Sequence, residues 1–259
     1  MALIRIQDLT VTVPMSDREK VLVDKVNLTI EEERVTALVG GSGSGKTTTA
    51  LSILRLLHPA LMIKNGIIFY KDNDLVRLPE HSLQKIRGKD IGFVFQDPLN
   101  AFNPVFSVGY QIEEVLRFHT NLNKTQREHR VLELLDLVGM PDPKQNARNF
   151  PHQLSGGMRQ RAMIAQAIAC DPKLIIADEP TSSLDVTLQA RIIELFQRLK
   201  KQIRVSILLI THDLGVVAHL ADDVAVMTGG RLVESGSVSD VLERPKHDYT
   251  KELMQALEF

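Results

Sequence analysis

A glycine-rich stretch near the start of the chain has the residue types and spacing of a phosphate-binding loop. Residues 40–47 read Gly-Gly-Ser-Gly-Ser-Gly-Lys-Thr, fit the pattern G-x-x-x-x-G-K-S/T, and directly follow the apolar run Val35–Val39. Glycines let backbone N–H groups turn toward a β-phosphate, and a lysine there reaches the β and γ oxygens. A chance glycine-serine turn is the alternative, but a strand before and a helix after favour a nucleotide triphosphate site.

The loop therefore supplies a first set of candidate ligand contacts. The phosphate-binding candidates are Gly40, Gly41, Ser42, Gly43, Ser44, Gly45, Lys46, Thr47 and Thr48. Among them, the Thr47 hydroxyl is also a candidate Mg²⁺ ligand at the positive end of the helix that follows.

Two neighbouring carboxylates follow a second apolar strand. Leu174–Ala177 is wholly apolar and leads into Asp178 and Glu179, at the strand end where open α/β sheets bind ligands. We expect Asp178 to hold Mg²⁺, directly or through water, and Glu179 to polarise the water that attacks a γ-phosphate. Alternatively, the two residues simply start a solvated turn before Pro180, a reading that the upstream phosphate loop disfavours.

A third motif lies at the start of an expected helix. Residues 154–161 read Leu-Ser-Gly-Gly-Met-Arg-Gln-Arg, which places Ser155 as the N-cap. A serine hydroxyl and the N–H groups of Gly156 and Gly157 would together form an anion site at the helix N-terminus. An ordinary capped helix is the alternative, but it gives no reason for two glycines, which weaken a helix.

Composition indicates one large globular domain, or a core with a small subdomain. The chain has 259 residues, of which 44% are hydrophobic and 24% charged, and its formal net charge is −1. This near-zero charge argues against nucleic acid as a partner, because such binders usually carry a basic stripe. No apolar run approaches the roughly 18 residues that span a bilayer, and Arg5 and Asp8 lie where a signal peptide would be apolar. We therefore expect the chain to stay in the cytoplasm.

The lone cysteine, Cys170, cannot form an internal disulfide. It follows the apolar run Ala162–Ala169, and this position favours a buried structural thiol over a reactive one.

The elements that must position these residues arrive in the order of a nucleotide-binding core interrupted by a helical insert. Apolar patterns predict strands at Leu3–Val13, Val21–Ile30, Val35–Val39, Ile67–Tyr70, Ile91–Phe95, Leu174–Ala177 and Val205–Ile210, then a hairpin of Val224–Met227 and Arg231–Glu234 around Gly229-Gly230. A polar turn is expected at Ser16–Lys20, and a helix from about Lys46 to Leu57. Helical periodicity runs from Val108 to about Gly139, until Pro141 and Pro143 break it. A helix then begins near Ser155, and the C-terminus is also predicted to be helical.

With its Leu-Ser-Gly-Gly-Met-Arg-Gln segment, the chain resembles the ATPase subunits of ABC transporters, since that segment is the signature of the superfamily. The likeness covers nearly the whole chain. It implies an α/β fold, namely a P-loop ABC-type nucleotide-binding domain with a mixed sheet core, an N-terminal antiparallel β region and a helical subdomain insert. Residues 1–259 would form this single domain, with 1–96 and 160–259 as the core and about 97–159 as the helical subdomain that includes the signature.

The resemblance assigns three more site residues. Gln96 would lie in the loop that senses Mg²⁺ and the membrane partner, Asp185 in the Ser183-Leu184-Asp185 loop that faces the opposite subunit, and His212 in the switch that contacts the γ-phosphate. Each is weak by itself, because Gln96 could be a surface turn and an isolated histidine after a strand is more often structural. Five motifs in the family's order are much stronger.

The family implies an ATPase that converts ATP and water to ADP and phosphate, with ATP and Mg²⁺ as ligands. Two subunits would sandwich two ATP molecules, each between one P-loop and the other subunit's signature helix. Closure would swing the helical insert, with Gln96 as a hinge, and pull on a docked membrane protein. The implied partners are a second and different ATPase chain, two transmembrane permease subunits and an external substrate-binding protein. The implied location is peripheral, on the cytoplasmic face of the bacterial inner membrane.

Finer features resemble the peptide and nickel importers, and in particular the short nickel-importer subunit. These features are Gln96-Asp97-Pro98, Ala101-Phe102-Asn103-Pro104, Pro245-Lys246-His247 with Tyr249-Thr250, the glycine at 41, and the run from Ala221 to Met227. Many peptide-importing members continue into a cysteine-bearing extension that holds an iron–sulfur cluster, and this sequence has no cysteine beyond Cys170. We therefore expect no such cluster, and the cargo stays open between oligo- or dipeptides and nickel or a metal chelate.

One departure and two rival classes remain. The family usually stacks the adenine on an early aromatic residue, yet no Phe, Tyr or Trp precedes Gly40, so aliphatic residues such as Val13 or Val21 would take that place.

The first rival class is a soluble ABC ATPase in DNA repair or translation, which would need a long coiled-coil insert or a second cassette. The second is a hydrolysis-deficient structural subunit, which should have lost Glu179, Ser155 or His212.

Overall fold

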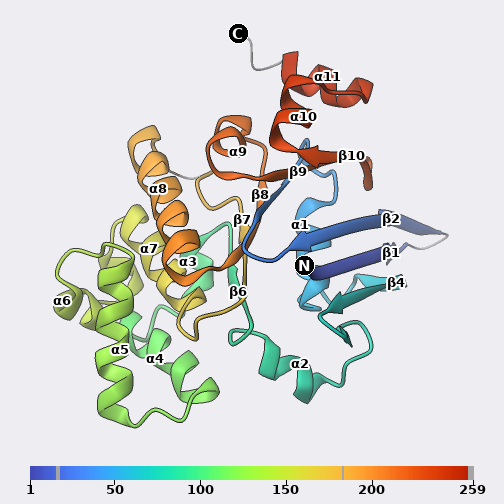
Figure 1. Ribbon diagram of the computed structural model, residues 1–259. Helices are drawn as coiled ribbons and strands as arrows, with labels where there is room; N and C mark the ends of the chain where they lie inside the picture. The colour runs from blue at the N-terminus through green and yellow to red at the C-terminus, as the bar shows by residue number, and fades with distance from the viewer. Residues whose placement is uncertain (16–17, 183, 256–259) are drawn as a thin grey trace. The chain divides into compact units, whose positions relative to one another are not determined.

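The computed structural model describes residues 1–15, 18–182 and 184–255, and the chain divides into two compact units. The first unit consists of Met1–Leu83 and Ser206–Phe259, and the second of Gln84–Val205. In Figure 1 the first unit takes the colours at the two ends of the bar, and the second runs from teal through green to orange. The predicted limits of the helical subdomain, about 97–159, stay a prediction.

An antiparallel sheet forms the N-terminal part of the first unit, as predicted. Its strand order is β2-β1-β4-β5, with β1 Ala2–Pro14, β2 Glu19–Glu31, β4 Met62–Tyr70 and β5 Asn73–Asp74. The turn between β1 and β2 is shorter than expected, because Glu19 already pairs with Pro14. Residues 16 and 17 of that turn lie outside the described residues.

The other strands of the first unit are mainly parallel and carry the functional loops. They follow the order β10-β9-β3-β8, with β3 Val35–Val39, β8 Ser206–Thr211, β9 Asp223–Thr228 and β10 Arg231–Ser237. β3 pairs in parallel with β8 and β9, and β10 returns antiparallel to β9. Every residue of β3 and β8 is buried, as unbroken apolar runs predict for strands covered on both faces.

Five helices accompany these strands among the described residues. They are α1 Lys46–Ile53, the boundary helix α2 Glu80–Ile86, α9 Leu214–Leu220, α10 Val238–Glu243 and α11 Asp248–Gln255. The predicted end of α1 at Leu57 was wrong. Arg55 adopts a left-handed backbone with φ of 51°, which a helix cannot continue through.

The second unit combines two parallel strands with a group of helices. β6 Ile91–Val94 pairs with β7 Leu174–Asp178, and the helices are α3 Pro98–Ala101, α4 Val108–His119, α5 Lys124–Leu137, α6 Pro143–Arg148, α7 Gly156–Ala167 and α8 Val186–Ile203, with a 3₁₀ turn at Pro151–Gln153. The predicted break of the periodicity by Pro141 and Pro143 was wrong, because α5 already ends at Leu137 and Gly139 follows with φ of 71°. Pro143 instead begins α6, because proline is well suited to the first helical position. The helices α2, α3, α6, α8 and α9 were not predicted.

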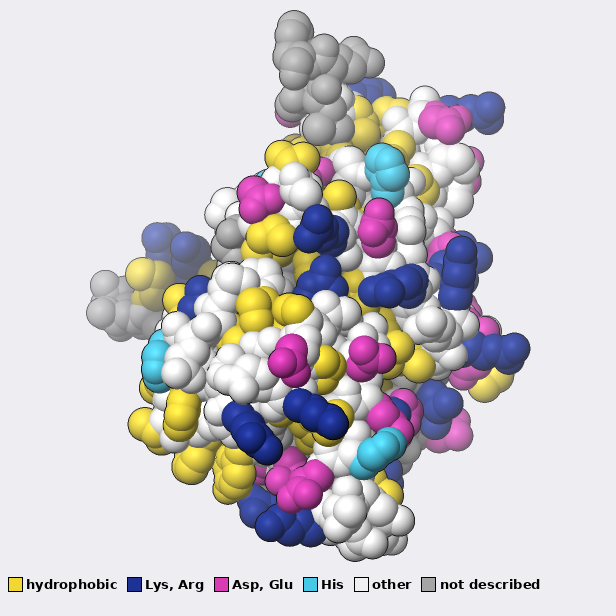
Figure 2. All heavy atoms as spheres, turned by 90° about the vertical axis from the view of Figure 1, so that its left-hand side faces the viewer, with side chains coloured by type: hydrophobic (Ala, Val, Ile, Leu, Met, Phe, Trp, Pro, Cys, Tyr) yellow, Lys and Arg dark blue, Asp and Glu magenta, His cyan; other side chains and the backbone are white. Residues whose placement is uncertain are grey.

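The surface mixes both signs of charge. Figure 2 shows dark blue and magenta side chains interspersed with yellow ones on one face of the molecule. Among the described residues, no helix combines the length and the apolar character that crossing a bilayer requires.

Cys170 is half-buried, whereas a buried structural thiol was predicted. Burial and the neighbouring Asp171 carboxylate nevertheless raise the pKa of the thiol to about 11. Both effects disfavour the thiolate, because one removes hydration and the other adds a like charge. The thiol is therefore partly accessible but chemically quiet at neutral pH.

We predict that iodoacetamide alkylates Cys170 at pH 7.5 about a hundred-fold more slowly than it alkylates the same cysteine in the denatured chain, because thiolate is the reactive form. The rate should keep rising about ten-fold per pH unit to about pH 10, whereas the denatured control levels off about two units lower. Mass spectrometry of the modified peptide measures both rates. A native rate that levels off with the denatured control would contradict the raised pKa.

Candidate functional site

The phosphate loop of the first unit folds around its own lysine. Lys46 is only 6% exposed, and its ammonium donates to the carbonyl oxygens of Gly40 and Gly41 at 2.9 Å each and to the Ser44 hydroxyl at 3.4 Å. The following helix α1 has Gly45 as its N-cap, with φ of 101° and no side chain to satisfy the first N–H groups. Such uncapped N–H groups and the helix dipole favour a phosphate at this end.

Backbone from other segments holds the loop from behind. A Cβ added to Gly40 would lie 2.1 Å from the carbonyl oxygen of Met227 in β9, so only glycine fits there. The Gly230 N–H, in the turn between β9 and β10, donates to the carbonyl of Ser44 at 3.1 Å. Backbone atoms of Met227 and Gly230 thus hold the loop, and neither contact uses a side chain.

His212 lies beside this loop, as the resemblance implied. β3 and β8 are parallel neighbours with Val39 paired to Thr211, so Gly40 and His212 follow paired positions at one edge of the sheet. The Thr211 hydroxyl accepts a hydrogen bond from the Asp213 N–H at 3.0 Å, and Asp213 caps α9, so both neighbours of His212 are fixed. The histidine itself is exposed. It can therefore reach a ligand without first losing a place in the core.

Gln96, Asp178 and Glu179 meet in the second unit by the same principle. β6 and β7 are parallel with Val94 paired to Ala177, so the chain reaches Gln96 and the two carboxylates at the same strand edge. Asp178 is 4% exposed, Glu179 is half-buried and Gln96 is exposed. Asp178 contributes a carboxylate and Gln96 an amide oxygen, and hard oxygen donors of this kind fit Mg²⁺. In the first unit, the exposed Thr47 hydroxyl is a donor of the same chemistry.

The backbone of Glu179 is strained. Its φ is 45°, in the left-handed region, although the next residue is Pro180 and a residue before proline prefers extended backbone. Such a conformation costs about 1–3 kcal/mol and persists where the surroundings fix it. Buried Asp178 precedes it, and the Ser182 N–H and hydroxyl donate to the Glu179 carbonyl at 3.2 and 3.1 Å. The surroundings of Glu179 thus hold its backbone in a conformation that it would not adopt by itself.

The signature helix α7 begins where the sequence predicts. Ser155 is its N-cap and accepts a hydrogen bond from the Met158 N–H at 3.3 Å. The absence of a side chain has a different effect at each of the two glycines. A Cβ on Gly157 would lie 3.2 Å from the Leu188 side chain of α8, whereas a Cβ on Gly156 would meet nothing within 4 Å. Gly157 therefore allows close helix packing, and Gly156 leaves the N-terminus of α7 open to an approaching group.

Asp185 lies close to the signature through the same packing. Its carboxylate caps α8 by accepting from the Leu188 N–H at 2.9 Å, and Leu188 is the residue that packs on Gly157. The structure thus brings the loop before α8 together with the start of α7. Ser183 of that loop lies outside the described residues. That Asp185 faces another subunit stays a prediction.

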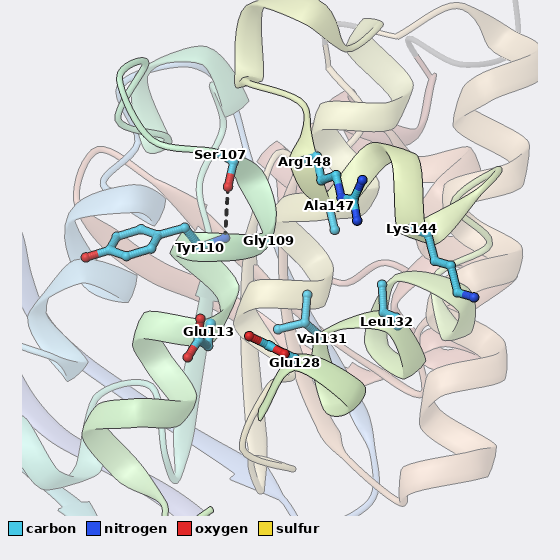
Figure 3. A pocket seen from close by; sticks show the side chains of 10 residues that line it. All are labelled: Ser107, Gly109, Tyr110, Glu113, Glu128, Val131, Leu132, Lys144, Ala147 and Arg148. Carbon is cyan, nitrogen blue, oxygen red and sulfur yellow. Dashed lines mark hydrogen bonds between the residues drawn. The ribbon is translucent and has the colours of Figure 1, made fainter. Parts of the chain in front are cut away.

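A groove lies among the helices of the second unit, away from the motifs named so far (Figure 3). It has a volume of about 610 Å³ and is lined by the start of α4 with Tyr110 and Glu113, by α5 and by α6. Gly109 allows the close approach of α4 and α6, because a Cβ there would lie 2.6 Å from the Ala147 carbonyl oxygen. Figure 3 shows Ser107 accepting the Tyr110 N–H at the head of α4.

Exposed apolar side chains gather between the end of β6 and the start of α4. We call this set the apolar edge; its members, with their exposed fractions, are Phe95 40%, Leu99 53%, Val105 69%, Phe106 42% and Tyr110 38%. The rings of Phe106 and Tyr110 stack with centroids 4.9 Å apart. The motifs Gln96-Asp97-Pro98 and Ala101-Phe102-Asn103-Pro104 were singled out in the sequence but this edge was not predicted, although three of its residues lie directly beside them.

The second contact that sequence analysis missed joins the far C-terminus to the phosphate loop. The Gly41 N–H donates to the Tyr249 hydroxyl at 2.9 Å, across a separation of 208 residues. Tyr249 belongs to the Pro245–Thr250 segment, which the sequence showed only as a mark of resemblance. No periodicity could indicate a contact over that distance.

Comparison with known proteins agrees with these arrangements. The oligopeptide transport ATP-binding protein OppD of Bacillus subtilis is 46% identical over 256 residues, or 98% of this chain and 72% of that protein. The dipeptide transport ATP-binding protein DppD of Haemophilus influenzae is 44% identical over 258 residues, or 99% of this chain and 78% of that protein. A dimeric post-hydrolysis structure of the ATP-binding cassette MJ0796, bound to ADP and Pi, is 29% identical with a TM-score of 0.81, covering 91% of this chain and 98% of that chain.

A family model gives the assignment directly. Residues 23–182 match the model described as ABC transporter, and this range contains the phosphate loop, Gln96, the signature and the paired carboxylates. The predicted resemblance and fold are thereby confirmed. The chain belongs to the ABC transporter family.

Proposed function

We propose that this chain is the ATP-binding and ATP-hydrolysing subunit of a membrane importer of oligo- or dipeptides. The observation that carries the proposal is the buried Lys46 ammonium in a phosphate loop whose helix has no side-chain cap, with His212 at the same sheet edge. The oligopeptide and dipeptide transport proteins OppD and DppD align over nearly the whole chain, and this similarity supports peptide transport. Nickel or a metal chelate is the alternative cargo, suggested by finer sequence features.

Each site residue then has one task in hydrolysis. Lys46 and the loop N–H groups bind the β- and γ-phosphates, and His212 contacts the γ-phosphate. Thr47, Gln96 and Asp178 would hold Mg²⁺, which supplies positive charge that neutralises the phosphate oxygens. Glu179 orients the attacking water and accepts its proton, so the products are ADP and phosphate.

A complete site requires a second subunit in this proposal. Ser155, Gly156 and Gly157 at the open start of α7 would bind the γ-phosphate held by the partner's phosphate loop, and Asp185 would face the partner. The dimeric form of the related cassette supports such a pair. We propose that the partner is a different ATPase chain, as in the subfamily that the sequence resembles.

The apolar edge gives this subunit a place to meet a membrane protein. Isolated exposed apolar residues are ordinary, but here five of them fall within 16 positions, and the rings of Phe106 and Tyr110 stack on one another. It begins directly beside Gln96, so a permease docked there would contact the loop that senses the nucleotide. We therefore place the chain peripherally on the cytoplasmic face of the membrane, with two permease subunits and an external substrate-binding protein completing the importer.

We predict that Glu179→Gln binds ATP with near-normal affinity yet hydrolyses it at least about a hundred-fold more slowly, because it removes only the proton acceptor. Lys46→Ala is the matched comparison and should instead lose affinity, because the phosphates lose their cation. Titration with ATP and phosphate-release kinetics distinguish the two. Normal turnover by Glu179→Gln would refute the assigned role.

Mixing two inactive variants tests the partner. In a homodimer, Lys46→Ala paired with Ser155→Arg puts both defects in one composite site and leaves the other intact, so mixing restores part of the activity. In an obligate heterodimer neither variant complements the other. We expect no recovery from the mixture, and activity only when wild-type chain meets its cognate second ATPase and permeases. Substantial recovery would establish a homodimer instead.

Reconstitution in liposomes tests the cargo and the apolar edge together. With permeases, second ATPase and loaded binding protein present, we expect oligo- or dipeptides to stimulate phosphate release at least about five-fold, and nickel not to do so. Val105→Glu should lose that stimulation, because burying a charge in an apolar contact is unfavourable.

Phe118→Ser is the control for this experiment, since Phe118 is 67% exposed on α4 of the same unit but outside the apolar edge. It should retain stimulation. Equal losses from both variants would show that the apolar edge has no special part, and stimulation by nickel alone would replace the peptide assignment.

A further inference from the structure

The C-terminal segment of the first unit makes contacts that nucleotide hydrolysis, as described so far, does not use. The segment Pro245–Thr250 leads from the connection after α10 into the first turn of α11 and brings Tyr249 to the phosphate loop. Its tyrosine hydroxyl accepts the Gly41 N–H at 2.9 Å. Resting on the proposed ATPase function, we infer that Tyr249 is a positioning residue that holds the entrance of the phosphate loop in its binding conformation.

The hydrogen bond acts on a peptide unit that Lys46 also holds. The Gly41 N–H and the Gly40 carbonyl belong to the same planar peptide group. Tyr249 accepts from the N–H, and the Lys46 ammonium donates to the carbonyl at 2.9 Å. A rotation of this peptide would therefore break both bonds at once, and two such bonds in series polarise one another. The Tyr249 hydroxyl thus controls the direction of the Gly40 carbonyl, and this carbonyl anchors the phosphate-binding Lys46.

Glycine at this place makes the control necessary. Gly40 has φ of 150°, and glycine backbone has more conformational freedom than that of any other residue. Gly40 lies too close to the Met227 carbonyl oxygen to carry a Cβ, so no side chain at position 40 can pack to fix the loop. A hydrogen bond from outside the loop restricts it in addition to the backbone contacts described above. Tyr249 supplies that bond from a different part of the chain.

Tyr249 is itself held firmly enough to serve as an anchor. It packs, with Leu253, against a buried apolar cluster that includes Val39 of β3 and Val226 of β9. These two residues are paired in the sheet, directly before the phosphate loop and near Met227. Tyr249 and the phosphate loop are therefore both supported by the paired strands β3 and β9.

Glu234 of β10 fixes the segment that leads to Tyr249. Its carboxylate accepts the N–H groups of Lys246 at 2.8 Å and His247 at 3.0 Å. Burial acts to raise the pKa of Glu234, but the hydrogen bonds that it accepts outweigh burial and keep the pKa below its ordinary value. The group is therefore a charged acceptor at neutral pH, and charge-assisted bonds of this kind are strong. Loss of the Glu234 charge should therefore loosen the contact between Tyr249 and Gly41 indirectly, through Lys246 and His247.

The test compares ATP binding by the full-length chain and its Tyr249→Phe variant. Phenylalanine keeps the ring in the apolar cluster and removes only the hydroxyl. One neutral hydrogen bond corresponds to about a three- to ten-fold change in an equilibrium constant, so we expect the dissociation constant for Mg-ATP to rise by that factor. The KM for ATP should rise similarly in the assembled transporter while kcat stays within about two-fold, because the loss acts on loop placement and not on water attack.

Hydrogen exchange gives a readout that a general structural role would not move. In Tyr249→Phe without nucleotide, exchange of the Gly41 amide should speed up, while exchange in the paired strands β3 and β9 stays as in wild type. Glu234→Gln should raise the dissociation constant in the same direction. Its effect should not add to that of Tyr249→Phe, since both act through one bond.

Asp248→Asn is the matched control. Asp248 lies beside Tyr249 in the first turn of α11, and its exposed carboxylate pairs with the Lys251 ammonium at 2.9 Å. It should change ATP affinity by less than about two-fold. An equal loss from Asp248→Asn, or wild-type affinity and Gly41 exchange in Tyr249→Phe, would overturn the inference. If the wild-type chain itself bound no ATP, the proposed function would fail instead, so the two failures are distinguishable.

Discussion

The nucleotide loop depends on one constraint: backbone that must face phosphates has no room for side chains and therefore has to be held from behind. Met227 presses its carbonyl against Gly40, Gly230 donates to Ser44, and Tyr249 accepts from Gly41. These three contacts come from β9, from the turn after it, and from the last helix. The conformation of a loop that lies before residue 50 thus depends on the C-terminal segment of the first unit.

Parallel strand pairing explains how distant motifs become neighbours within each unit. The carboxyl ends of adjacent parallel strands lie at one edge, so register alone brings His212 beside the phosphate loop and Gln96 beside Asp178 and Glu179. Loops at such an edge can carry chemistry because the buried strands below supply rigidity. The left-handed backbone of Glu179 uses that rigidity, since a mobile loop would relax the strain.

The parts of this fold that the sequence predicted well are those with local causes. The strands β3, β7 and β8, predicted from mostly apolar runs, and the Ser155 cap of α7 depend on neighbouring residues, and the structure confirms them. α8 and α9 were overlooked although Asp185 and Asp213 mark their starts as caps. By contrast, the early end of α1 depends on an unusual backbone angle at Arg55, and the bond to Tyr249 on tertiary placement. No local pattern encodes either one.

The helices at the phosphate loop and at the signature differ in how they begin. The signature helix α7 starts with its own serine cap, so one N–H group of its first turn has an acceptor without any ligand. Helix α1 starts at a glycine and has no side-chain cap. A phosphate bound at that end would interact favourably with the helix dipole, so nucleotide binding and the stability of α1 are coupled in the first unit.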